Sequence, residues 1–442
     1  MLRYESMAFS ISMMKRWNPY TYLNRLEKMG IRMDLDAVRK ALKGLGNPER
    51  GYPSILIAGT NGKGSVAAMA SSILSAGGFS VGLYTSPHLV NVRERIRIGN
   101  MMIPEGDFWE TMRDVDDHLI EPLTYFEFMT VLAFHYFRQK KINVAVVEVG
   151  MGGRLDATHV ISPSVAVISH IALDHQEYLG KRLKDIAREK AAIIPRRGIC
   201  ITGVQQLSAR QVIVDTCRER EATLLRVGGE IRVRRHRKDG AFSYGSPIHA
   251  YTSLRCGLVG GHQQTNAALA VAAVETMAVK GFNVNEEAVR EGLGNVRWEG
   301  RLEVLQKAPL LLLDGAHNPA GVGSLCRVLR EDFSFRRLIV LFGVLRDKHY
   351  PEMIRRLSVF QPFMILTEPP SERSMPPEEL LPIARTYLQQ SEMIPSPVDA
   401  LKYALSLAGK DDLVCVTGSL YLVGEIKKTF PSLGTMIAAG EK

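Results

Sequence analysis

Short apolar runs alternate with amphipathic stretches along most of the chain, which is the pattern of an α/β protein. Residues 63–76 are a typical amphipathic stretch, in which apolar side chains recur at helical spacing. The apolar runs are short and bounded by polar residues, as are strands of a parallel sheet that is covered on both faces. Six runs are expected to form such strands, at residues 55–58, 144–149, 165–168, 310–313, 338–342 and 413–416.

A linker is expected near residue 296. A helical pattern ends at about Leu293, and residues 296–301 separate it from the next apolar run. A length of 442 residues suits two or three domains of about 150 residues each. We therefore predict a larger domain over residues 1–296, with a mainly parallel sheet, and a smaller Rossmann-like α/β domain over residues 297–442.

The composition excludes several classes of protein. Apolar residues make up 46% and charged residues 23% of the chain, which excludes a disordered or collagen-like protein. No apolar run approaches the roughly 20 residues of a membrane helix. The apolar stretch at residues 7–14 is short and is followed by Lys15 and Arg16, so we expect no signal peptide. Five scattered cysteines without a CxxC pair predict reduced thiols and a cytoplasmic protein.

Half of the net charge of +10 lies in one short stretch. Residues 226–238 hold six basic residues and one acid, Glu230. Positive charge fits nucleic acid, an anionic membrane or anionic small substrates. The stretch alternates like a strand and then meets Asp239 and Gly240, so we expect a surface hairpin appended to the sheet of the first domain. No zinc-finger, RNP-type or helix-turn-helix pattern accompanies it, so nucleic-acid binding is not expected.

The strongest candidate for chemistry is the sequence GTNGKGS at residues 59–65. It follows one predicted strand and opens the predicted helix, as a phosphate-binding loop does, so we predict that the first domain is a P-loop-type ATPase domain. Its glycines let backbone N–H groups turn toward phosphate oxygens. Lys63 can reach the terminal phosphates, and Ser65 can approach Mg²⁺. Lys63 precedes Gly64, unlike the usual Walker order, and a glycine-rich turn with an exposed lysine remains the alternative.

Two further polar groups follow predicted strands. Glu148 lies near the carboxyl end of the run at residues 144–149, where open α/β sheets place their ligands. A carboxylate in an apolar run needs a partner, either Mg²⁺ or a neighbouring Arg or Lys. His175 follows the run at residues 165–168 and is expected at the same edge as Glu148, whereas His170 is interpreted as structural.

Two later segments have comparable patterns. Asp314 comes directly after the run at residues 310–313, at the expected ligand edge of the second sheet. The alternative there is a capped turn before a helix, which needs no ligand. The sequence GHQQTN at residues 261–266 is expected to open an alanine-rich helix that is capped by Thr265 or Asn266.

In their order along the chain, these motifs resemble the folylpolyglutamate synthase/dihydrofolate synthase family, a branch of the Mur ligase superfamily. The resemblance runs over nearly the whole chain. It rests on GTNGKGS, TSPHL (residues 85–89), LTYFE (123–127), EVGMGGRLDAT (148–158), ALDHQEYLG (172–180), REKAAI (188–193) and DGAHNPAG (314–321).

The resemblance implies an ATP-dependent amide ligase that acts as a monomer. In such an enzyme MgATP, with two Mg²⁺ ions, phosphorylates a carboxylate of a folate or of dihydropteroate. The amine of L-glutamate then attacks the acyl phosphate, and phosphate leaves. This chemistry depends on positioning and charge neutralisation more than on a nucleophilic side chain. The alternatives are a Mur-type ligase for a cell-wall or polymer precursor and a nucleotide-gated binding protein without turnover.

The resemblance also implies roles for individual residues. Spacing alone makes Lys190 a lysine on a helix surface, but the family often carbamylates the matching lysine. Lys63, Lys190 and His317 are the implied catalytic residues. The implied metal ligands are Ser86, Glu148 and His175. The implied ATP-binding residues are Thr60, Asn61, Gly62, Lys63, Gly64, Ser65, Asn266, Arg301 and Asp314. The implied substrate-binding residues are Leu123, Thr124, Tyr125, Phe126, Gly153, Arg154 and Leu155.

Three positions depart from the family pattern. His159 stands where an asparagine is usual, and Glu299 stands where a proline commonly precedes Gly-Arg. Residues 343–348 form a looser version of the family's loop. None of these departures removes an implied ligand. The sequence leaves open whether one or both ligase activities are present.

Overall fold

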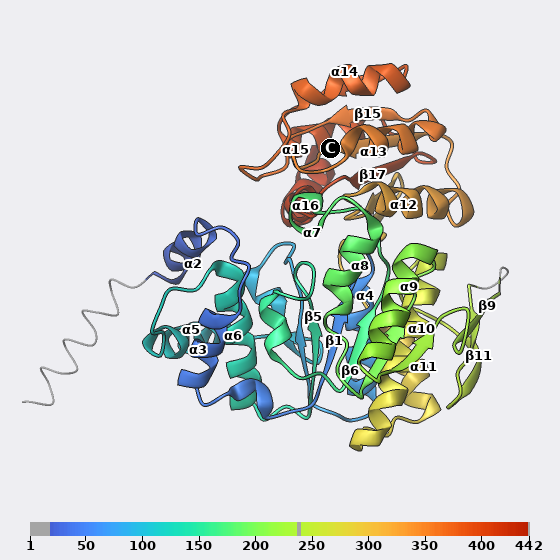
Figure 1. Ribbon diagram of the computed structural model, residues 1–442. Coiled ribbons are helices and arrows are strands. Elements are labelled where there is room, and N and C mark those ends of the chain that lie inside the picture. Colours follow the sequence, from blue (N-terminus) through green and yellow to red (C-terminus); the bar gives the residue numbers. More distant parts are fainter. Residues whose placement is uncertain (1–17, 237–239, 441–442) are drawn as a thin grey trace, which may run out of the picture.

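The structure is a computed structural model that describes residues 18–236 and 240–440 (Figure 1). An N-terminal α/β unit, drawn in blue to yellow, lies below a smaller C-terminal unit, drawn in orange to red. All six predicted strands form, with ends shifted by at most one residue, and the predicted helix is α4 (Lys63–Ala76). The mainly parallel α/β architecture is therefore confirmed.

The larger sheet has eight strands in the order β4-β3-β2-β5-β1-β6-β7-β8. The strands next to β1 are both parallel to it and lie on opposite sides, so the strand order reverses beside β1. Open α/β sheets bind ligands in the crevice at the carboxyl ends of the strands at such a point. The strands are β1 (Ser54–Ala58), β2 (Val81–Tyr84), β3 (Ile96–Ile98), β4 (Met101–Met102), β5 (Val144–Glu148), β6 (Val165–Ile168), β7 (Ile199–Thr202) and β8 (Thr223–Arg226).

Helices cover both faces of this sheet, which explains why its central strands are apolar throughout. Along β1, Ile55 and Ile57 point to one face, and Leu56 and Ala58 point to the other. The first face is covered by α4, α10 (Gly261–Thr276) and α11 (Glu286–Asn295). The second face is covered by α2 (Pro19–Glu27), α3 (Asp36–Gly44), α5 (Glu105–Asp117), α6 (Tyr125–Gln139), α8 (Leu183–Ala191) and α9 (Leu207–Glu219).

The predicted surface hairpin forms, but it is not an extension of the larger sheet. The strands β9 (Arg232–Arg235), β10 (Phe242–Gly245) and β11 (Ala250–Leu254) make a separate antiparallel sheet. Apolar side chains of this sheet, Phe242 among them, pack in the same core as α10. The turn predicted at Asp239 lies outside the described residues. The sheet therefore attaches through its own apolar face rather than through strand pairing.

The smaller sheet has six strands in the order β12-β13-β17-β14-β15-β16, and helices lie on both of its faces. In this sheet only β12 is antiparallel to its neighbour. The other five strands are parallel, as the Rossmann-like prediction requires. Its strands are β12 (Glu303–Lys307), β13 (Leu310–Leu313), β14 (Leu338–Phe342), β15 (Phe363–Leu366), β16 (Ser391–Met393) and β17 (Leu413–Thr417). Its helices are α12 (Pro319–Glu331), α13 (Tyr350–Leu357), α14 (Pro377–Tyr387), α15 (Pro397–Leu407) and α16 (Leu420–Gly440).

Local sequence sets where the helices near the cleft begin. At the start of α6, the Thr124 N–H donates to Glu127 Oε2 at 2.7 Å, and the Glu127 N–H donates to Thr124 Oγ1 at 3.4 Å, which forms a capping box. In contrast, α10 begins at Gly261, directly after Gly260 at φ 105°. Thr265 and Asn266 are therefore inside α10, and the prediction that one of them caps it is wrong.

One apolar contact lies beside the linker between the two units. Leu89, from the larger unit, packs against the apolar cluster that includes Val423 of α16. A Cβ atom on the linker residue Gly300 would lie 3.0 Å from Leu89 Cδ1. A Cβ atom on Gly424 would lie 2.1 Å from the carbonyl oxygen of Leu89. Glycine at these two positions therefore permits the close contact.

All five cysteines have free thiols, as the sequence predicts, and four of them are buried. In the part of the chain that the structure describes, no helix is long and apolar enough to cross a membrane.

Candidate active site

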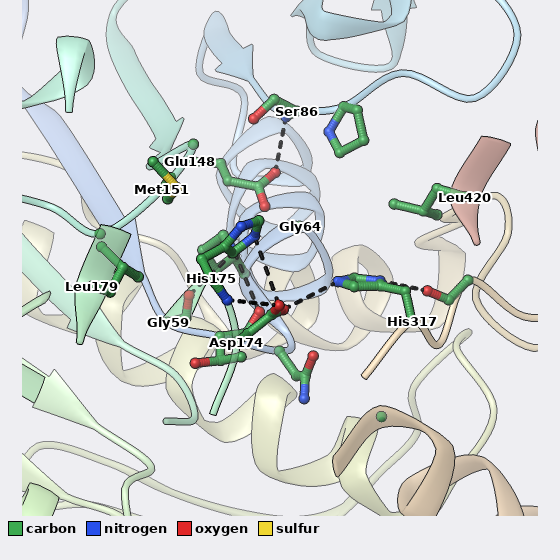
Figure 2. Close-up of a pocket in the computed structure, with 18 of the residues that line it drawn as sticks. Gly59, Gly64, Ser86, Glu148, Met151, Asp174, His175, Leu179, His317 and Leu420 are labelled. Carbon is green, nitrogen blue, oxygen red and sulfur yellow. Dashed lines mark hydrogen bonds and ion pairs between the residues drawn. The ribbon is translucent and has the colours of Figure 1, made fainter. Parts of the chain in front are cut away.

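A cavity of about 540 Å³ lies between the two α/β units. One wall comes from the loops that follow β1, β2, β5 and β6, and the other comes from the loops that follow β13, β14 and β17. Figure 2 shows Glu148, Asp174 and His175 of the first wall facing the same space as His317 of the second. Residues far apart in the sequence therefore meet at one site.

The phosphate-type loop between β1 and α4 has the backbone that its glycines allow. Gly59 has φ 152°, and Gly62, which precedes the first residue of α4, has φ 88°. A Cβ atom on Gly59 would lie 2.0 Å from Ser169 Oγ, and one on Gly62 would lie 2.7 Å from Asn266 Oδ1. The loop is thus held between a neighbouring strand end and α10, and a larger residue would displace it.

Lys63 lies over this loop at the cavity. Its Nζ donates to the carbonyl oxygens of Gly59 at 3.2 Å and Thr60 at 3.3 Å. These bonds fold the ammonium group back toward the start of the loop. Because the helix N-terminus adds positive partial charge there, the loop favours an anionic group.

Three predicted metal ligands lie along the first wall. The backbone N–H of Ser86 donates to Glu148 Oε2 at 3.2 Å, and His175 precedes the short helix α7 (Gln176–Leu179). All three residues line the cavity. Within the described residues, no group of three His, Cys, Asp or Glu side chains is arranged to hold a metal ion by itself. A metal ion held by the predicted set would therefore also need the Ser86 hydroxyl and further oxygen ligands such as water or phosphate.

The protonation states along this wall suit a cation. Burial raises the pKa of Glu148, and the charge of Lys63 and the Ser86 N–H counteract that rise. Burial lowers the pKa of His175 to about 4, against the opposing charge of Asp174. His175 is therefore a neutral imidazole with a free lone pair at neutral pH, and a cation beside Glu148 would favour the ionised form of its carboxyl group.

Lys190 is buried rather than exposed on the surface of α8. Its Nζ donates to the carbonyl oxygen of Gly59 at 2.9 Å. Burial and the nearby charge of Lys63 lower the pKa of Lys190 to about 7. The amine is therefore substantially neutral, and nucleophilic, at neutral pH. The alternative that spacing alone offered, a helix-surface lysine, is wrong.

Asp174 connects the two walls. Its carboxylate accepts from Lys348 Nζ at 2.8 Å and from Asn318 Nδ2 at 3.0 Å, and it lies 3.5 Å from His317 Nε2. Burial would raise the pKa of Asp174, but its contacts with His317 and Lys348 hold it well below its usual range. Asp174 is therefore a fixed negative charge that binds three side chains of the C-terminal unit.

A second contact across the cleft joins Asn61 to Asn318. The Asn61 Nδ2 donates to Asn318 Oδ1 at 3.1 Å, and the Asn318 Nδ2 donates to Asn61 Oδ1 at 2.9 Å. Asn318 Oδ1 also accepts from the Gly321 N–H at 2.8 Å and thereby caps α12. The capped turn that the sequence offered is therefore present, and residues 314–317 of the same turn also line the cavity.

The predicted ATP residues of the second wall lie near the linker. Asp314 Oδ2 accepts from the Leu302 N–H at 3.1 Å, and Asp314 Oδ1 accepts from the Ala316 N–H at 3.0 Å. Burial raises the pKa of Asp314, and the charge of Arg301 opposes that rise. Asp314 and Arg301 line the cavity at this wall, whereas Asn266 lines it from α10 of the larger unit, beside Gly62.

The predicted acceptor-binding residues divide into those that line the cavity and those that lie behind or beside it. Thr124, Phe126 and Leu155 line the cavity. Leu123 is fully buried in the core beneath α6. Tyr125 lies under the guanidinium group of Arg95, at 5.1 Å from its ring centre. The remaining two lie against α8, where Arg154 pairs with Glu189 at 3.0 Å and a Cβ atom on Gly153 would lie 2.7 Å from the Glu189 carbonyl oxygen.

Comparison with known proteins decides the family. Residues 57–274 match the Mur ligase middle domain, and residues 300–420 match the Mur ligase glutamate ligase domain. The dihydrofolate synthase/folylpolyglutamate synthase of Bacillus subtilis is 33% identical over 91% of this chain and 96% of that protein. The chain belongs to the folylpolyglutamate synthase/dihydrofolate synthase family of Mur ligases.

Solved structures of this ligase family agree with the fold. E. coli FolC in complex with DHPP and ADP has a TM-score of 0.86 and 30% identity, over 93% of this chain and 97% of that one. A bifunctional folylpolyglutamate synthase/dihydrofolate synthase with Mn, AMPPNP and L-glutamate bound has a TM-score of 0.84 and 28% identity, over 93% of this chain and 97% of that one.

Several cavity residues of this Mur ligase were not singled out by the sequence. Arg95, Asp174 and Lys348 line the cavity, and no role was predicted for any of them. Asp174 directly precedes His175 in the motif ALDHQEYLG, so the motif could have indicated that Asp174 belongs to the site. Lys348 lies in the loop after β14, at the carboxyl edge of the second sheet, which is a further signal. Arg95 had none, because it directly precedes the short strand β3 and belongs to none of the recognised motifs.

Proposed function

We propose that this Mur ligase uses ATP to join L-glutamate to a carboxylate of a folate, of dihydropteroate, or of both, through an acyl phosphate. The observation that carries the proposal is the single cavity in which a phosphate-type loop, the Glu148–His175 wall and the glutamate ligase domain meet. The relatives named above carry both activities in their names, which supports either acceptor.

We assign the nucleotide to the loop of residues 60–65. Lys63 and the backbone N–H groups at the start of α4 neutralise the phosphates there. Asn266 of α10 lies beside the loop, and Arg301 and Asp314 hold the nucleotide from the other side of the cleft. Because these groups come from both units, the nucleotide favours closure of the domains.

Ser86, Glu148 and His175 would hold a divalent cation, with two Mg²⁺ ions and a carbamylated Lys190 as the full proposed arrangement. A bound cation supplies charge neutralisation between the phosphates and the attacking carboxylate. The nearly neutral amine of Lys190 supports carbamylation, since only a neutral amine adds carbon dioxide. The finding of a neutral His175 beside a buried Glu148 supports the cation site.

In the proposed reaction, the acceptor carboxylate attacks the terminal phosphate of ATP and ADP leaves. The glutamate amine then attacks the acyl carbon, phosphate leaves with the electrons of the carbon–oxygen bond, and the amide nitrogen releases one proton to phosphate or water. His317 and Lys348 are close enough to Asp174 to share its charge, and they lie on the wall from which the glutamate ligase domain would present the amine. The protein's main contribution is to align the two reactants and exclude water.

Several further features belong to the same proposal. We place the domain boundary at residue 296, between α11 and β12. The free cysteines fit the reducing cytoplasm. A monomer suffices, because one chain supplies both walls of the cavity.

The decisive experiment is ligase turnover with MgATP and labelled L-glutamate, with dihydropteroate and tetrahydrofolate offered in separate reactions. Label incorporated with both acceptors would identify a bifunctional enzyme, and label with one would name its activity. Phosphate release should require the acceptor and glutamate together. Clear ATP binding without incorporation into either acceptor would overturn the proposal.

A further inference from the structure

Arg95 is a buried cation that faces the cavity. It ends the single turn Val92–Arg95 before β3, and only 8% of its surface is exposed. Arg95 is also one of the residues that line the cavity. A guanidinium group with little access to water needs hydrogen-bond acceptors or a counter-charge.

The contacts of Arg95 leave part of its side chain without a counter-charge. Its Nε–H donates to His88 Nδ1 at 2.9 Å, and its guanidinium carbon lies 5.1 Å from the ring centre of Tyr125. Across residues 18–236 and 240–440, no carboxylate lies within ion-pair distance of Arg95. The two outer nitrogens, Nη1 and Nη2, are the pair that binds a carboxylate in the bidentate manner.

The position of Arg95 relates this cation to the reacting groups. Its carbonyl oxygen accepts from the Thr85 N–H at 3.0 Å, and the next residue, Ser86, donates to Glu148. On its other side Arg95 lies over Tyr125, whose neighbour Phe126 lines the cavity. Arg95 therefore stands between the proposed cation site and the proposed acceptor wall, where a reacting carboxylate would have to lie.

We propose that Arg95 binds the carboxylate of the acceptor that is to be phosphorylated, and that His88 is the positioning residue that orients the Arg95 guanidinium. An arginine nitrogen can only donate, so His88 Nδ1 must be the acceptor of the Nε–H bond. This bond and the Tyr125 ring fix the plane of the guanidinium group. The inference rests on the proposed function, because it assigns a site to the acceptor of that reaction.

The test compares two ligands that differ only at this carboxylate. Pteroic acid and its carboxamide are titrated calorimetrically into the full chain with MgADP present. The unmodified protein is expected to bind the acid about 10- to 100-fold more tightly than the amide, as a charge-assisted bidentate contact would give. Arg95→Met is expected to remove most of this preference and to leave the affinity for MgADP unchanged.

Two sets of controls separate the roles. Arg93→Met removes a neighbouring cation that donates to the Ile103 carbonyl oxygen, and it should keep the preference for the acid. His88→Leu should reduce the preference, whereas His88→Asn, which keeps an acceptor near the position of Nδ1, should largely restore it. An unchanged preference in Arg95→Met, or an equal loss in Arg93→Met, would overturn the inference.

The titration does not depend on turnover, so the two proposals can fail separately. If the unmodified protein prefers the acid through Arg95 but incorporates no glutamate, the proposed function is wrong and the carboxylate site stands. If it incorporates glutamate but shows no preference for the acid, the inference about Arg95 is wrong and the ligase remains.

Discussion

At the scale of single residues, Lys63 makes the most direct prediction. Its ammonium group donates to two backbone carbonyl oxygens of its own loop. These two hydrogen bonds involve no other side chain. Lys63→Ala should therefore fold normally and lose about 100- to 1,000-fold in kcat, the usual cost of removing a group that stabilises developing charge. Lys43→Ala, at an exposed position near the end of α3, is the matched control. Near-normal turnover of Lys63→Ala would contradict the role of the loop.

Lys190 predicts a dependence of stability on pH. Its folded pKa of about 7 lies below the value near 10.4 of an unfolded lysine. The unfolded state therefore holds more protons between these values, so this residue makes stability rise with pH from about 7 to 10. Over that range the unfolding free energy of the uncarbamylated protein should rise relative to that of Lys190→Met, which has no amine to titrate. Urea unfolding at a series of pH values measures this change. A constant difference would show that the amine is not perturbed.

The burial of Lys190 also shows where sequence reasoning stops. The spacing of α8 could not separate an exposed lysine from one that points under the phosphate loop. The deciding contact is the carbonyl oxygen of Gly59, which is 131 residues earlier in the chain. Such contacts between distant segments leave no periodic signal in either one. Motif resemblance identified the residue, but only the fold gives the physical reason for its altered pKa.

At the scale of elements, the turn into α4 can be tested with two glycines of similar backbone. Gly62 has φ 88° and Gly78 has φ 86°, but a Cβ atom would meet Asn266 Oδ1 at 2.7 Å in the first case and nothing within 4 Å in the second. Gly62→Ala and Gly78→Ala should each lose about 1 kcal/mol of stability from the backbone alone. Only Gly62→Ala should also weaken ATP binding, as measured by calorimetry. Equal ATP affinity in both variants would contradict the tight fit of the loop.

The elements that sequence predicted best are the ones buried on both faces. The strands β6, β13 and β14 begin and end where their apolar runs do, because every side chain in them meets a covering helix. Prediction failed where the backbone conformation of a glycine decided where a helix begins. At Gly260 a glycine conformation starts α10 earlier than any polar cap would. The basic hairpin shows alternation but not which sheet it joins, since that depends on packing against α10.

At the scale of the whole molecule, polar contacts hold the two units together over the phosphate-type loop. Asp174 and Asn61 of the larger unit meet Lys348, His317 and Asn318 of the smaller one. The ion pair is nearly inaccessible to water, with 6% and 7% of the two side chains exposed. These contacts favour the closed arrangement, and removal of one partner would leave the other charge without compensation.

Lys348→Met and Asp174→Asn should therefore shift the enzyme toward an open arrangement. Each single change is expected to weaken closure by up to about 3 kcal/mol, and the double change should cost less than the sum. Small-angle X-ray scattering would show a larger radius of gyration in each variant. Arg346→Met removes a cation that pairs at 3.2 Å with Glu379 within the smaller unit, and it should leave the radius unchanged.

The same pair predicts how closure responds to acid. A carboxyl group with a lowered pKa contributes stability above its unfolded pKa and loses it only as pH falls through the folded value. Because the pKa of Asp174 lies well below its usual range, mild acidification should not open the cleft. Opening near the ordinary pKa of an aspartic acid, seen by the same scattering measurement, would contradict the ion pair.

The apolar contact of Leu89 beside the linker behaves differently from the polar contacts over the loop. Water can solvate the carboxylate, ammonium and amide groups when the cleft opens, whereas Leu89 would expose hydrocarbon if it left Gly300 and Gly424. The units should therefore rotate about the Leu89 contact rather than part from each other. Such a rotation exposes mainly polar surface, so its heat capacity change is small. The enthalpy of opening would then be nearly the same at all temperatures, and a van't Hoff plot of the open fraction would be close to a straight line.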